Sequence, residues 1–153
     1  MSASSPYFRA LFTNGMDETD HREVFIPGIA ADMMGIIVEY AYTRNANVTP
    51  ENVERLLPAA DQFHVLGLVK ACSQFLENQI NVDNVIGIRN FAKHYFCTGL
   101  ERTCQKYLME NFVRVATLGN EILTLPLQDF IDILESDELN VKNEEFTFDV
   151  IMR

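Results

Sequence analysis

The stretch Thr49-Pro-Glu-Asn-Val-Glu-Arg-Leu-Leu-Pro-Ala-Ala-Asp-Gln-Phe63 sets the fold class of this chain. Thr49 and Pro50 suit the start of a helix, because a hydroxyl can accept a bond from a free amide and proline fits the first turn. The apolar residues that follow stand three or four positions apart, which is helical spacing: Val53, Leu56, Leu57, Ala60 and Phe63. The stretch therefore predicts an amphipathic helix that packs on a core.

The helical pattern continues on both sides of this stretch. Residues 31–42 are almost wholly apolar, interrupted by Asp32 and Glu39, and such a run is too short for a bilayer and typical of a buried helix. Thr98 and Glu101 fit a capping box, in which hydroxyl and carboxylate satisfy each other's free amides. We expect a mainly α chain, with short loops joining helices at 5–13, 68–76, 85–92, 98–112, 127–134 and 143–151 and a brief strand at 22–26.

The composition is that of a folded globular protein with an acidic surface. Hydrophobic residues make up 48% of the 153 positions and charged residues 22%, far from the composition of a disordered chain. The formal net charge of −10 would repel phosphate backbones and anionic lipids, so neither nucleic acid nor a membrane is expected as a partner. The three cysteines form no CxxC pair, which favours a reducing compartment, the cytoplasm or the nucleus.

No pattern in the chain points to catalysis, a cofactor or a metal. Cys97 stands three residues after His94, the nearest approach to a nucleophile beside a base, but a structural thiol at the end of an apolar helix is the simpler interpretation. The glycines form neither GxGxxG nor GxxxxGK[ST]. The carboxylates near residues 135–145 fit a solvated surface. We therefore predict a protein that is not an enzyme and that has no cofactor.

Met16, unlike Met33 and Met34, does not lie at helical spacing inside an apolar stretch. It lies in the polar loop of residues 14–20, where an exposed apolar side chain could anchor a partner. A methionine packed locally against its own loop fits the sequence equally well.

Several segments carry a resemblance to a known family. The run Ser4-Ser-Pro-Tyr-Phe-Arg-Ala-Leu-Phe-Thr13 resembles the end of the second helix of BTB domains in the kelch-like family, and residues 24–28, 37–43, 52–63 and 72–76 follow in the family's order. Residues 84–88 and 136–141 resemble a BACK domain. The resemblance implies a mainly α fold: the C-terminal helical part of a BTB/POZ α/β domain at 1–78, then an all-α BACK domain of stacked helical hairpins at 79–153, incomplete at its C-terminal end.

The resemblance also implies a function. Members of the family act as non-catalytic adaptors that bind a cullin of the third type in a cullin-RING ubiquitin ligase, and so serve protein ubiquitination. Their loop motif of hydrophobic residue, any residue and glutamate is similar to Met16-Asp17-Glu18. The loop of Phe63 and His64 lies where the family makes further cullin contacts, and the helix pair 84–113 resembles the element that extends that surface.

The chain departs from the family's pattern in two ways. The opening strands and first helix, which carry most of the BTB homodimer interface, do not precede Met1, so we expect a homodimer in a longer form. No kelch repeat with its double glycine follows. The alternative is a truncated, marginally folded structural or interaction product that does not bind a cullin by itself. Residues 40–44 and 137–143 are most similar to the kelch-like ten subgroup, which is associated with male germ cells.

Overall fold

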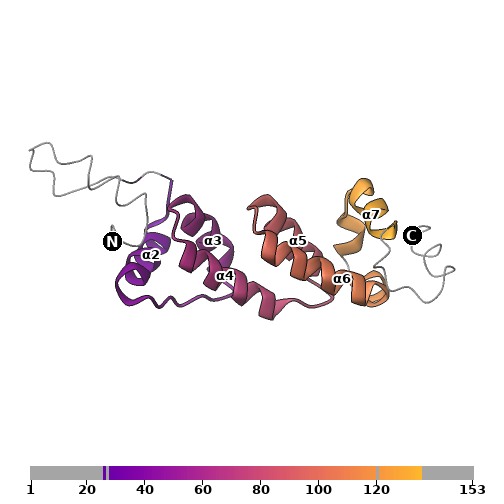
Figure 1. Ribbon diagram of the computed structural model, residues 1–153, viewed down its shortest axis with the longest axis horizontal. Helices are drawn as coiled ribbons and strands as arrows, with labels where there is room; N and C mark the ends of the chain where they lie inside the picture. Colours follow the sequence, from indigo (N-terminus) through magenta and orange to yellow (C-terminus); the bar gives the residue numbers. More distant parts are fainter. Residues whose placement is uncertain (1–25, 27, 120, 136–153) are drawn as a thin grey trace, which may run out of the picture. The chain divides into compact units, whose positions relative to one another are not determined.

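The computed structural model describes residues 26, 28–119 and 121–135, and the regular structure in these ranges is helical (Figure 1). The predicted mainly α class is confirmed. The expected elements at 5–13, 22–26 and 143–151 fall wholly or mostly outside the described residues. The described elements are α2 (Ala31–Thr43), α3 (Val53–Gln62), α4 (Leu66–Gln79), α5 (Val85–His94), α6 (Thr98–Leu118), the 3-10 turn η1 (Glu121–Thr124) and α7 (Leu127–Leu134).

The chain divides into two compact units between Phe75 and Leu76, and α4 crosses the division. The apolar positions predicted from the stretch 49–63 are all buried in the first unit. In α2, expected to be a buried helix, only Met33 and Ile37 are buried, because α3 contacts it along one stripe. The remaining buried apolar side chains of this unit are Val53, Leu56, Leu57, Ala59, Ala60, Phe63, Val65, Leu68 and Cys72.

The turn that opens α3 is held by the side chain of Asn52. Its Oδ1 accepts a hydrogen bond from the Thr49 N–H at 2.9 Å, and its Nδ2 donates to the Asn47 carbonyl at 2.8 Å. An amide side chain can do both because it carries a donor and an acceptor. Thr49 was predicted as the cap through its hydroxyl. Asn52 stands at the cap position instead, and the Thr49 carbonyl accepts from the Val53 N–H at 3.0 Å.

The turn that opens α5 repeats this arrangement. Asn84 Oδ1 accepts from the Asn81 N–H at 2.8 Å, and Asn84 Nδ2 donates to the Gln79 carbonyl at 2.9 Å. The Asn81 carbonyl in turn accepts from the Val85 N–H at 3.1 Å. Each of these residues lies 32 positions after its counterpart in the turn at Asn52. The two helices therefore begin with the same pattern of hydrogen bonds.

The loops that follow α3 and α5 are also alike. Each contains three residues, and the middle one has a left-handed backbone, with φ of 53° at His64 and 55° at Phe96. In each loop the N–H after that residue donates to a carbonyl in the last turn of the preceding helix, Val65 to Ala60 at 2.8 Å and Cys97 to Ala92 at 2.8 Å. This is the Schellman motif, which satisfies the free carbonyls at the end of a helix.

The chain therefore contains an internal repeat, residues 49–76 and 81–108. The start of α6 belongs to this repeat, and it has no side-chain cap, so the capping box expected from Thr98 and Glu101 is wrong. Cys97, not Thr98, is the residue at the N-cap position of α6. Identical residues occupy equivalent positions at Asn52 and Asn84, Val53 and Val85, Ala60 and Ala92, Gly67 and Gly99, Leu68 and Leu100, Cys72 and Cys104, and Leu76 and Leu108.

The second unit is built on α5 and α6, which lie side by side (Figure 1). Glu121 of η1 closes the first turn of α5, where its Oε2 accepts from the Gly87 N–H at 2.9 Å. Gly119, at the end of α6, lies close to the turn before α5. A Cβ at this position would lie 2.7 Å from the Val82 carbonyl oxygen. The buried apolar side chains are Leu76, Val85, Ile86, Ala92, Leu100, Cys104, Leu108, Met109, Phe112, Val115, Ala116, Ile122 and Ile133.

One buried position of the repeat holds Leu57 in the first copy and Arg89 in the second, and Arg89 contacts α7. Leu57 is fully buried in the first copy, and its counterpart Arg89 is only 8% exposed. Arg89 Nη1 lies 3.6 Å from Asp129 Oδ2 of α7, and Lys93 Nζ lies 3.4 Å from the other carboxylate oxygen. Within the described residues, Arg89 Nε and Nη1 have no hydrogen-bond partner, so the charge of Asp129 is the main compensation for burying the guanidinium.

Removing Asp129 should therefore destabilise the second unit. We expect Asp129→Ala to lower the free energy of unfolding by about 3 kcal/mol, because it leaves a buried charge without a partner. Lys93→Ala, which breaks only the exposed pair, should change it by less than about 0.5 kcal/mol. Arg89→Leu combined with Asp129→Ala should recover most of the loss, since leucine is the residue at the equivalent position of the first copy. Urea unfolding followed by circular dichroism measures all three, and equal effects of the two single changes would contradict the account.

Candidate partner-binding surface

The structure treats the four expected site residues differently. Met16 and Glu18 lie outside the described residues. Phe63 and His64 are neighbours in the loop between α3 and α4, yet Phe63 is fully buried and His64 is exposed. Of the two, only His64 has a side chain exposed to solvent, while Phe63 packs in the core beneath the loop.

The backbone of the loop forces this division. Phe63 and Val65 both enter the core, and the left-handed residue between them turns its side chain outward. Histidine is among the residues that tolerate this conformation better than most. The burial of Phe63 and Val65 therefore fixes the conformation of the loop.

Leu66 adds an apolar group beside His64 that the sequence reasoning missed. It is the first residue of α4 and is 71% exposed. The signal was present in the helical spacing, because Leu68, Cys72 and Leu76 define the buried face of α4 and Leu66 lies off it. We call residues 63–66 the His64 tip.

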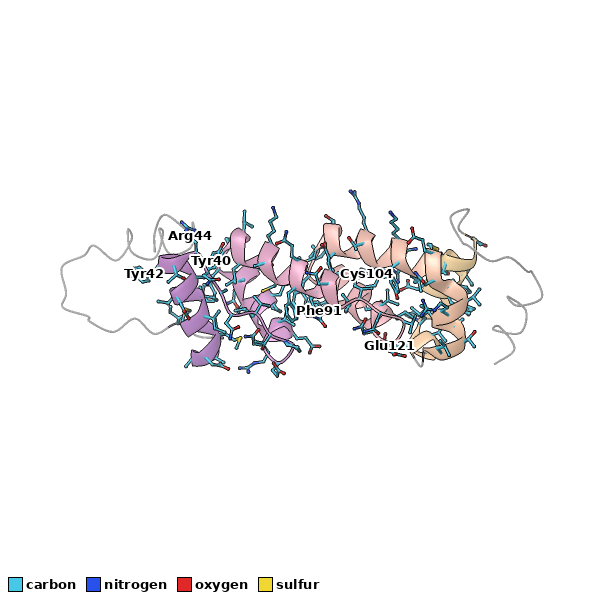
Figure 2. The ribbon with its side chains drawn as sticks, turned by 90° about the horizontal axis from the view of Figure 1, so that it is seen from below. Tyr40, Tyr42, Arg44, Phe91, Cys104 and Glu121 are labelled. Carbon is cyan, nitrogen blue, oxygen red and sulfur yellow. The ribbon has the colours of Figure 1, made fainter. Side chains whose placement is uncertain are left out.

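Tyr40 fixes α2 against the beginning of α4. Its hydroxyl lies against Gly67, where any Cβ would overlap it. Figure 2 shows Tyr40 directed towards the other helices and Tyr42, two residues later, directed away from them. Tyr42 is 74% exposed, and Arg44 ends α2 in the left-handed conformation.

The second copy of the repeat presents its own tip. Phe96 occupies the position of His64 and is 87% exposed. Tyr95 and Cys97 on either side are partly buried. We call residues 95–98 the Phe96 tip, and it lies within the helix pair 84–113 that was expected to extend the binding surface.

Comparison with known proteins identifies the two units. The family model described as "BTB/POZ domain" matches residues 1–80, and the one described as "BTB And C-terminal Kelch" matches residues 85–153. The chain belongs to the BTB–BACK family. Kelch-like protein 6 of Homo sapiens is 36% identical over 152 residues, which are 99% of this chain and 24% of that protein. The chain thus spans about a quarter of the length of this curated relative.

The BTB–BACK assignment settles the class of activity. BTB and BACK domains are non-catalytic interaction modules, and this agrees with the prediction that the chain is not an enzyme. The His64 tip lies in the part that matches BTB, and the Phe96 tip lies in the part that matches BACK. The predicted boundary after residue 78 and the kelch-like ten subgroup stay predictions.

Cys97 and His94, the pair that resembled a nucleophile and a base, both contact Tyr95. Cys97 Sγ donates to the Tyr95 carbonyl at 3.6 Å, and the His94 ring packs edge-on against the Tyr95 ring at 4.7 Å. Both residues thus support the Phe96 tip. In residues 26, 28–119 and 121–135 no three His, Cys, Asp or Glu side chains gather as a metal site would require. In the same ranges no helix is both long and apolar enough to cross a bilayer.

Phe96 is expected to lower the stability of the BTB–BACK chain, because its backbone has a positive φ and its ring is exposed. We expect Phe96→Gly to raise the free energy of unfolding by about 0.5–1 kcal/mol, because glycine adopts positive φ without strain. Arg114→Gly, at an exposed position inside α6, is the control and should lower it by about 1 kcal/mol. Urea unfolding measures both, and a loss of stability in Phe96→Gly equal to that of the control would show that the ring packs on the fold.

Cys104 should behave as an inert core thiol. Burial, and secondarily the charge of Glu77, raises the pKa of Cys104 from 9.0 to about 11, although Arg89 acts in the opposite direction. The neutral thiol therefore supports folding fully below pH 9 and loses that contribution as the pH rises towards 11. At pH 8 a maleimide reagent should label Cys104 in urea but not in the folded chain, as read by peptide mass spectrometry. Rapid labelling of folded protein would contradict the assignment.

Proposed function

We propose that this chain is an adaptor module that binds the N-terminal domain of a cullin of the third type and so serves a cullin-RING ubiquitin ligase. Membership of the BTB–BACK family supports the class, since kelch-like members typically act as such adaptors. The observation that carries the proposal is the His64 tip, in which exposed His64 and Leu66 are held by buried Phe63 and Val65.

The tip has the features of a small binding hot spot. An exposed leucine offers an apolar anchor, and the imidazole beside it can donate or accept a hydrogen bond. The loop that presents them is rigid, because Val65 and His64 donate to carbonyls of α3 at 2.8 Å each. Met16 and Glu18, which match the family's loop motif in residue type, are proposed as the second part of the same surface. The protein is proposed to act in the cytoplasm or nucleus, and to form a BTB homodimer in a longer form.

The proposal predicts a specific pattern of losses in cullin binding. His64→Gly and Leu66→Ser should each weaken the affinity about tenfold, and Met16→Ala with Glu18→Ala about tenfold or more, because each removes a contact at a hot spot. Glycine at residue 64 keeps the left-handed turn, so the fold survives. Leu127→Ser, at an equally exposed leucine on α7, is the matched control and should leave affinity unchanged. Isothermal titration calorimetry with the purified cullin domain measures all four.

Two results would count against the proposal. If the tip variants bind as the wild type does while the chain itself binds, the cullin contacts another surface. If the chain is folded by circular dichroism and does not bind, the alternative applies: an interaction product that has no cullin contact of its own.

A further inference from the structure

We draw no further inference here: the strongest candidate, the apolar surface patch on α7 made by exposed Leu127 and half-buried Phe130 and Ile131, carries nothing because nothing in the structure shows what covers it.

Discussion

Two backbone hydrogen bonds determine how this chain is arranged, Val65 N–H to the Ala60 carbonyl and Cys97 N–H to the Ala92 carbonyl. Each closes a Schellman turn, so that only three residues separate one helix from the next. The turn sends the residues on either side of its left-handed position towards the core. The middle residue is left outside. A side chain at that position is exposed by geometry, and for this reason the two tips are places where the chain can meet partners without losing core packing.

The repeat explains why one scaffold can carry two different surfaces. The asparagine-bonded helix starts and the buried Val, Ala, Leu and Cys positions are the same in both copies. Two of the positions that differ matter here: the residue at the tip, and the core position occupied by Leu57 in one copy and Arg89 in the other. Arg89 ties α7 to the second copy through Asp129. The shared positions form a common part of the two cores, and the function proposed here comes from exposed positions.

Sequence reasoning identified the helices and much of the core, because helical spacing of apolar residues reports directly on which side faces inward. It failed at the helix starts. Thr49 and Thr98 have the residue types of caps, but Asn52 and the turn at Cys97 form the observed ends, and these depend on backbone conformation. The family resemblance grouped Phe63 with His64 as contact residues, although the helical spacing had already placed Phe63 on the buried side, where the structure has it. The resemblance to the kelch-like family supplied the site expectations at Met16 and Glu18, which no spacing rule provides.

The central claim is that the chain presents a preformed tip at His64 and Leu66 to a cullin. The most direct test is calorimetric titration of the wild-type chain with the N-terminal domain of the third-type cullin, with the molar mass of the complex measured by light scattering. The account predicts a 1:1 complex per chain of micromolar or tighter affinity, with a small entropic penalty because the tip is rigid before binding. Absence of binding by a chain that is folded and monomeric would contradict it.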